Sequence, residues 1–171
     1  PVLVSLVEHA IRVGMHGVFV SGSGGEAMNL TNEQRGRLYS TALQSAAGRV
    51  PVLLGAIEAS TTRTIECIKT AEQLGGEYMV ITPAFYTRNS TQSEIIRHFE
   101  TISRQTGNVK LVIYNIPIHT NVNILPGTLA EACRIDKVCS VKDSSGNMQH
   151  FMELLYLTET LRRSGQISIF Q

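Results

Sequence analysis

The chain has 171 residues and a mass of 18.8 kDa, which fits one domain of ordinary size. Hydrophobic residues make up 43% of it and charged residues 17%, a composition that excludes a disordered chain. The 15 Lys and Arg residues nearly balance the 14 Asp and Glu residues, so the formal net charge is +1. Nucleic acids and membrane surfaces are therefore not expected partners.

The cysteines and the apolar runs indicate in which cellular compartment the protein is expected. Cys67, Cys133 and Cys139 form no C-x-x-C pair, which favours reduced thiols and a cytoplasmic protein over a disulfide framework. No apolar run reaches the roughly 18 residues of a membrane span, and no secretory signal pattern opens the chain. Because the sequence starts at Pro1 and stops inside an apolar run, we expect it to be part of a longer polypeptide.

Helices and strands alternate along the chain. Apolar spacing predicts a first helix over 2–13, further helices around 64–74 and 95–103, and Thr31 with Gln34 predicts a capping box that begins another. Gly14, Gly48, Gly75 and Gly76 stand where helices are expected to end. Short apolar runs flanked by Gly, Pro or Ser predict six strands buried on both faces, at 17–20, 51–55, 78–82, 111–114, 138–141 and 167–170.

This alternation predicts an α/β protein with a parallel sheet and helices outside it. Two architectures satisfy the pattern: an open doubly wound sheet and a closed (β/α)8 barrel. A complete barrel has about 250 residues, and periodicity alone does not choose between the two. In both, the ligand site lies at the carboxyl ends of the strands.

Lys142 is the lysine that follows a predicted strand at its carboxyl end. An amine in partly dehydrated surroundings presents its neutral, nucleophilic form more readily. The alternative is a structural salt bridge with a nearby carboxylate such as Asp143. Tyr114 ends another strand, where a phenol can transfer a proton; its alternative is a buried tyrosine whose hydroxyl is bonded to the backbone.

The run Gly22-Ser23-Gly24-Gly25 precedes a helix and predicts a loop whose amides hold a small anion, with a flexible turn as the alternative. It matches neither the dinucleotide fingerprint nor the P-loop. The five histidines form no metal-binding spacing, so no metal is predicted. His119 alone lies in a candidate site loop, with an ordinary surface histidine as the alternative.

Four strand-end motifs resemble those of the pyruvate-dependent Schiff-base aldolases, the family of dihydrodipicolinate synthase and N-acetylneuraminate lyase. They are Gly22-Ser23-Gly24-Gly25-Glu26, Thr82-Pro83, Tyr114-Asn115-Ile116-Pro117 and Val141-Lys142-Asp143-Ser144-Ser145-Gly146. The resemblance implies a (β/α)8 TIM barrel, here an incomplete chain covering helix 1 through strand 7. Residues 1–171 would then be a single domain that is incomplete at both ends.

The resemblance also implies a mechanism. Lys142 would form an imine with a 2-oxo acid, Tyr114 would shuttle protons, and Ser23 with the loop of Gly22 and Gly24 would hold the carboxylate. No cofactor or metal is needed, the partner is a small-molecule 2-oxo acid, and a homotetramer is expected. The protein is thus predicted to be a class I aldolase or lyase.

Three departures bear on the substrate. His119 stands where the synthases have an arginine, Phe85 replaces their relay tyrosine although Tyr86 is its neighbour, and Gly24 replaces a threonine. All three point away from lysine biosynthesis, and the glycine at position 24 resembles the 2-keto-3-deoxy sugar acid aldolases. The favoured substrate is therefore a 2-keto-3-deoxy sugar acid, with dihydrodipicolinate synthase as the alternative. A non-catalytic small-anion-binding protein is the alternative of another class, and an open-sheet nucleotide-binding protein ranks last.

Overall fold

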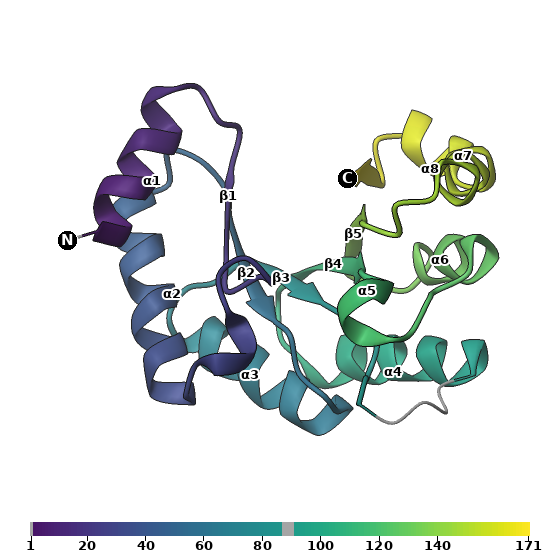
Figure 1. The fold of residues 1–171 in the computed structure, drawn as a ribbon, viewed down its shortest axis with the longest axis horizontal. Coiled ribbons are helices and arrows are strands. Elements are labelled where there is room, and N and C mark those ends of the chain that lie inside the picture. The colour runs from purple at the N-terminus through teal and green to yellow at the C-terminus, as the bar shows by residue number, and fades with distance from the viewer. Residues whose placement is uncertain (1, 87–90) are drawn as a thin grey trace.

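A computed structural model describes residues 2–86 and 91–171 and shows an α/β fold (Figure 1). Its strands form one parallel sheet in the order β1-β2-β3-β4-β5-β6. The strands are β1 Val18–Val20, β2 Val52–Ala56, β3 Tyr78–Ile81, β4 Lys110–Asn115, β5 Val138–Asp143 and β6 Ser168–Phe170. All six lie where the sequence predicts them. Because the spatial order follows the chain order, the sheet has no switch point and is not doubly wound.

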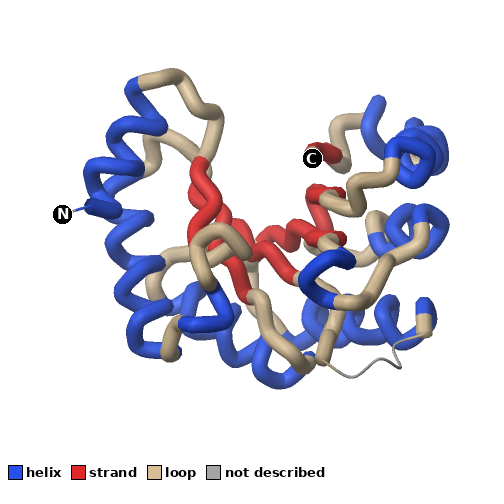
Figure 2. The backbone as a smooth tube through the Cα atoms, viewed as in Figure 1, coloured by secondary structure: helices blue, strands red, loops and turns tan. Residues whose placement is uncertain are grey.

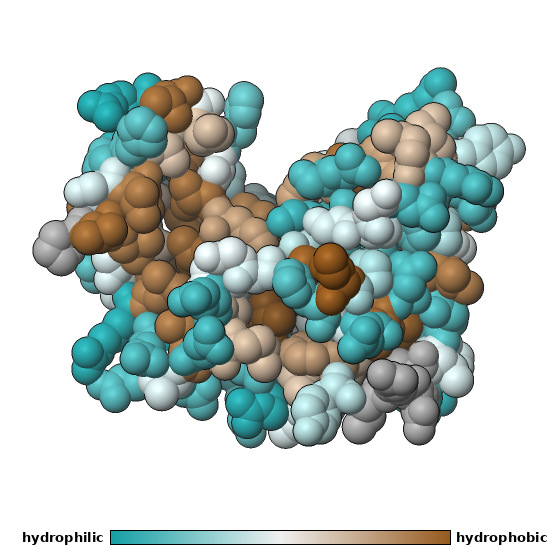
Figure 3. All heavy atoms as spheres, in the orientation of Figure 1, coloured by the Kyte–Doolittle hydropathy of each residue, from teal (hydrophilic) through white to brown (hydrophobic). Residues whose placement is uncertain are grey.

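The sheet is curled, and the helices cover its convex side (Figures 1 and 2). They are α1 Val2–Arg12, η1 Ala27–Asn29, α2 Asn32–Ala46, α3 Thr61–Gln73, α4 Gln92–Gln105, α5 Pro117–Thr120, α6 Pro126–Ala132, α7 Met148–Leu157 and α8 Glu159–Arg163. Within the described residues β1 pairs with β2 alone and β6 with β5 alone. The structure is therefore a six-stranded part of a barrel, and a notch lies between the α1 side and the α7 side (Figure 3).

Helix boundaries follow the predicted chemistry. The capping box of Thr31 and Gln34 is present at the start of α2. Gly14, Gly48 and Gly75 have φ angles of 84°, 72° and 86°, the left-handed conformation that suits glycine. Gly76 serves another purpose, because a Cβ there would lie 2.7 Å from the Leu54 side chain.

Alternate side chains of the strands form two apolar layers. Leu54, Ile81 and Ile113 belong to the large layer between strands and helices. Val80, Val112 and Tyr114 belong to a smaller layer on the concave side, where Phe19 packs against them. Because strand residues alternate between faces, this parity decides which side chains reach the interior of the curl. No helix of the described part is long and apolar enough to cross a membrane.

Candidate active site

A cavity of about 400 Å³ lies at the carboxyl ends of β1 to β4. Four side chains singled out from the sequence line it: Ser23, Phe85, Tyr114 and His119. The other lining residues are Glu26, Ala27, Met28, Asn29, Ile57, Thr82, Ile116 and Thr120. The strand-end rule thus brings together residues that are 96 positions apart in the sequence, from Ser23 to His119.

Lys142 lies beside Tyr114. The two residues are register partners on the adjacent strands β5 and β4, so their side chains share the concave face. Lys142 Nζ is 4.4 Å from the centroid of the Tyr114 ring and 5.1 Å from that of Phe19. Both distances are within the range of a cation–π interaction. The ring planes of Phe19 and Tyr114 meet at 79°, with centroids 6.1 Å apart, so the amine is held against two aromatic side chains.

Asp143 does not pair with Lys142, as the alternative from the sequence supposed. Its carboxylate accepts hydrogen bonds from Asn115 Nδ2 at 2.8 Å and from Ser145 Oγ at 2.8 Å. Asp143 is fully buried on the opposite side of β5, because consecutive strand residues point to opposite faces. The amine of Lys142 therefore lies on the aromatic side of the strand and the carboxylate of Asp143 on the helix side.

The glycine-rich loop begins with a sharp change of direction after β1. Ser21 has a φ of 57°, and the loop closes through hydrogen bonds from Gly25 N and Ala27 N to the Gly22 carbonyl. A Cβ on Gly22 would lie 2.8 Å from the Phe19 ring, so the loop passes close to that ring at a residue without a side chain. Gly24 is exposed with open space around its Cα, and the anion-holding role of Ser23 and Gly24 stays a prediction.

The segment after β3 places two aromatic residues differently. Phe85 lines the cavity, whereas Tyr86 is 92% exposed and has a φ of 83°. The structure therefore does not bring the Tyr86 hydroxyl to the cavity of its own chain. The left-handed backbone at Tyr86 explains this, since it turns the chain at that residue.

His119 is exposed and lines the cavity. It lies in the short helix α5 and not in a loop, but at the end of the sheet where the sequence predicts the site. Across residues 2–86 and 91–171 no group of three or more His, Cys, Asp or Glu side chains is arranged to hold a metal ion.

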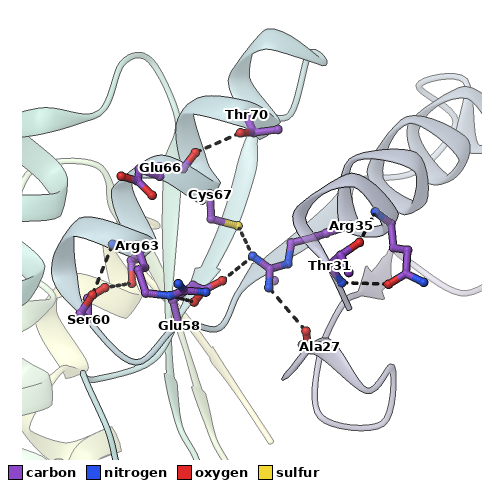
Figure 4. Close-up of polar contacts among 12 residues, drawn as sticks. Ala27, Thr31, Arg35, Glu58, Ser60, Arg63, Glu66, Cys67 and Thr70 are labelled. Carbon is purple, nitrogen blue, oxygen red and sulfur yellow. Dashed lines mark hydrogen bonds and ion pairs between the residues drawn. The ribbon is translucent and has the colours of Figure 1, made fainter. Parts of the chain in front are cut away.

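Sequence reasoning missed a buried polar cluster between α2 and α3 (Figure 4). Arg35 Nη1 donates to Glu58 Oε1, and Arg63 Nε donates to Glu58 Oε2 at 2.8 Å. Arg35 Nη1 also lies 3.4 Å from Cys67 Sγ, and Arg35 Nη2 contacts the carbonyl of Ala27, a cavity residue. A glutamate two residues beyond the apolar run of β2 is the signal that could have indicated it.

Six parallel strands in sequential order, with a lysine amine against a tyrosine ring at their carboxyl ends, define a barrel-type α/β protein with a lysine and tyrosine site. The chain belongs to the dihydrodipicolinate synthetase family, whose sequence profile matches residues 2–162.

Curated relatives and solved structures agree with this membership. The chain is 35% identical over 155 residues to the 4-hydroxy-tetrahydrodipicolinate synthase of Kosmotoga olearia, covering 90% of this chain and 52% of that protein. It is 33% identical to the synthase of Thermotoga neapolitana, covering 92% of this chain and 53% of that one. The chain thus spans about half the length of these relatives.

Two solved structures share the fold closely. Dihydrodipicolinate synthase from Thermotoga maritima matches 97% of this chain and 56% of its own, with a TM-score of 0.89 and 29% identity. The synthase from Acinetobacter baumannii, solved in complex with pyruvate, matches 98% of this chain and 55% of its own, with a TM-score of 0.87 and 26% identity.

Proposed function

We propose that the protein is a class I aldolase or lyase in which Lys142 forms an imine with the ketone of pyruvate or of another 2-oxo acid. The observation that carries the proposal is the placement of Lys142 Nζ 4.4 Å from the Tyr114 ring, at the carboxyl ends of β4 and β5. Family membership and the pyruvate complex of the Acinetobacter relative support it.

The chemistry follows from the groups present. The Lys142 nitrogen bonds to the ketone carbon of pyruvate, and the ketone oxygen takes up two protons and leaves as water. The positively charged imine withdraws electrons, so the methyl carbon can lose a proton and attack an aldehyde carbon. Hydrolysis then releases the product and restores the amine. Tyr114 would donate and accept the protons, and Ser23 with the amides near Gly24 would hold the carboxylate.

We propose two candidate reactions, in order of preference. The curated relatives are 4-hydroxy-tetrahydrodipicolinate synthases, so condensation of pyruvate with aspartate semialdehyde now comes first. Cleavage of a 2-keto-3-deoxy sugar acid, the first choice from the sequence, comes second. The observation that favours this second reaction is that His119 and Phe85 line the cavity, since neither offers the bidentate grip of an arginine on a second carboxylate.

We also propose that the chain is part of one (β/α)8 domain and that this domain assembles as a homotetramer. The sequential order of six parallel strands supports the barrel, and the tetramer rests on the family resemblance alone. Sedimentation of the full-length protein measures the assembly directly.

Borohydride reduction in the presence of pyruvate tests the central proposal. We expect one covalent adduct, equal in mass to pyruvic acid less one oxygen atom, on the peptide that contains Lys142. Lys142→Arg should abolish the adduct, and Lys137→Arg, at the opposite end of β5, should retain it. An unmodified chain would contradict the proposal and favour a non-catalytic anion-binding protein. Turnover of the semialdehyde against sugar acids then ranks the two substrates.

A further inference from the structure

A polar bridge joins β4 and β5 one residue beyond Tyr114 and Lys142. The register that pairs Tyr114 with Lys142 also pairs Asn115 with Asp143. Consecutive strand residues point to opposite faces, so the first pair faces the concave side and the second faces the helices. Asn115 and Asp143 are both fully buried.

The Asp143 carboxylate is the centre of the bridge. Oδ1 accepts from Asn115 Nδ2 at 2.8 Å and from the backbone Ser145 N at 3.3 Å. Oδ2 accepts from Ser145 Oγ at 2.8 Å and faces His150 Nδ1 at 3.4 Å. A buried carboxylate with this many donors is held in one orientation, because any other would leave polar groups unsatisfied.

The bridge extends to the elements on both sides. Asn115 Oδ1 accepts from Ile124 N at 3.1 Å, and the carbonyl of Ile124 is 2.8 Å from His150 Nε2. Since a carbonyl only accepts, His150 donates from Nε2. His150 lies in α7, so the bridge ties the ends of two strands to the segment before α6 and to the first turn of α7.

We propose that Asp143 is a positioning residue. Through Asn115 it fixes the position of Lys142 along β5 relative to Tyr114 on β4. This inference rests on the proposed function and deepens it, since it names what holds the imine-forming amine against the proton-transferring phenol. Neither Asn115 nor Asp143 is placed to touch a substrate, because both point away from the concave face and are fully buried.

The physical reason is the sensitivity of such reactions to geometry. A misplacement of about 1 Å can lower a rate on the order of 100-fold. At the carboxyl ends of β4 and β5 a backbone hydrogen bond from Ser144 N to the Asn115 carbonyl, 2.8 Å long, continues the ladder, and the side-chain bridge adds to it. The same pair of strands carries an irregular register between Leu111 and Val112. The bridge lies at the other end of the same pair of strands, one step past the last site residues.

The variant Asp143→Asn in the full-length protein tests the inference. It keeps the side-chain shape but replaces one carboxylate oxygen, which accepts hydrogen bonds, by an NH2 group, which donates them. At least one group that donates to the Asp143 carboxylate then loses its partner. We expect kcat and the rate of pyruvate adduct formation to fall about tenfold or more, while KM for pyruvate changes less than about threefold. A merely structural role would lower the melting temperature and leave kcat at its original value below that temperature.

An exchange of the two residues supplies the rescue. In Asn115→Asp with Asp143→Asn, a carboxylate at 115 still accepts from Ile124 N and from the amide at 143. We expect this double variant to recover most of the lost kcat. Lys137→Met, directly before β5, is the matched control, because it removes hydrogen bonds to the carbonyls of Ser103 and Thr106 at the other end of the strand. It should lower the melting temperature with kcat unchanged.

The outcomes separate the two proposals. An unmodified wild-type protein that forms no pyruvate adduct overturns the proposed function itself. Two results overturn the positioning role alone, provided that the wild type forms the adduct. One is an unchanged kcat in folded Asp143→Asn, and the other is failure of the double variant to recover kcat. If Asp143→Asn does not fold, Ser145→Ala takes its place, since it removes only one donor from the same carboxylate, and the same readings decide.

Discussion

Gly55 lies directly against the backbone carbonyl of Ser21, and a Cβ at this position would stand 2.0 Å from the Ser21 oxygen. Ser21 is the residue at which the chain turns from β1 into the glycine-rich loop, with a φ of 57°. The neighbouring strand β2 thus reaches the loop through a residue without a side chain. Ser23, two residues further along this loop, lines the cavity.

Gly55→Ala should therefore destabilise the protein by about 1–3 kcal/mol, the usual cost of overpacking, because the clash is with backbone and not with a flexible side chain. Urea unfolding measures the change. Gly36→Ala is the matched control, since it lies within α2 with open space around it and should stabilise the helix by about 0.5–1 kcal/mol. Equal stability of wild type and Gly55→Ala would contradict the close approach.

The buried pair of Arg35 and Glu58 leads to a second prediction. Their side chains are 6% and 3% exposed. Glu58→Gln should destabilise the protein by about 3–5 kcal/mol, because it leaves the guanidinium buried without its counter-charge.

Glu33→Gln is the comparison for that variant. It breaks the exposed pair of Glu33 with Arg37, both about three-quarters exposed, and should change stability by less than about 1 kcal/mol. Thermal unfolding of the two variants side by side measures the difference. If both lose the same small amount, Arg35 does not depend on Glu58 for its burial.

His98 gives the stability a pH dependence. Burial lowers the pKa of His98 from 6.5 to about 4, although its hydrogen bond to the Thr82 carbonyl opposes the shift. The unfolded state therefore binds a proton more readily than the folded state. Stability from this group is complete above about pH 6.5 and is lost as the pH falls towards 4, by roughly 3 kcal/mol in total.

His98→Gln should remove this dependence, since its amide can still donate to Thr82 O and accept from Thr61 Oγ1. The measurement is the free energy of unfolding of both proteins between pH 7 and pH 4. We expect the wild type to lose stability faster than the variant over this range. A constant difference between the two curves would show that His98 titrates at its ordinary pH when folded.

Much of this arrangement could be predicted from the sequence, and the reason is local. The apolar runs that end at Tyr114 and near Lys142 predict strands, and the strand-end rule then places both residues at one end of the sheet. Strand parity separates Lys142 from Asp143. These inferences need only the period of a strand and the direction of a parallel sheet.

The unpredicted parts depend on side chains that meet across many residues. Nothing near Arg35 indicates that its partner is Glu58, 23 residues later in the loop between β2 and α3. The same holds for His98, which contacts Thr61 and the Thr82 carbonyl. The left-handed backbone conformation of Tyr86 could not be predicted either, because a tyrosine has no preference for that conformation.

Tyr114→Phe separates the packing of the Tyr114 ring from the proton transfer proposed for its hydroxyl. The variant keeps the ring that packs on Phe19 and lies beside Lys142 Nζ, so the fold and the placement of the amine should be retained. It removes the hydroxyl, and loss of general acid-base catalysis typically lowers kcat by about 100- to 10,000-fold. We expect the melting temperature to change little and the borohydride adduct with pyruvate to form more slowly but to completion. Undiminished kcat in Tyr114→Phe would mean that another group transfers the proton, and loss of the adduct at all times would mean that imine formation itself requires the hydroxyl.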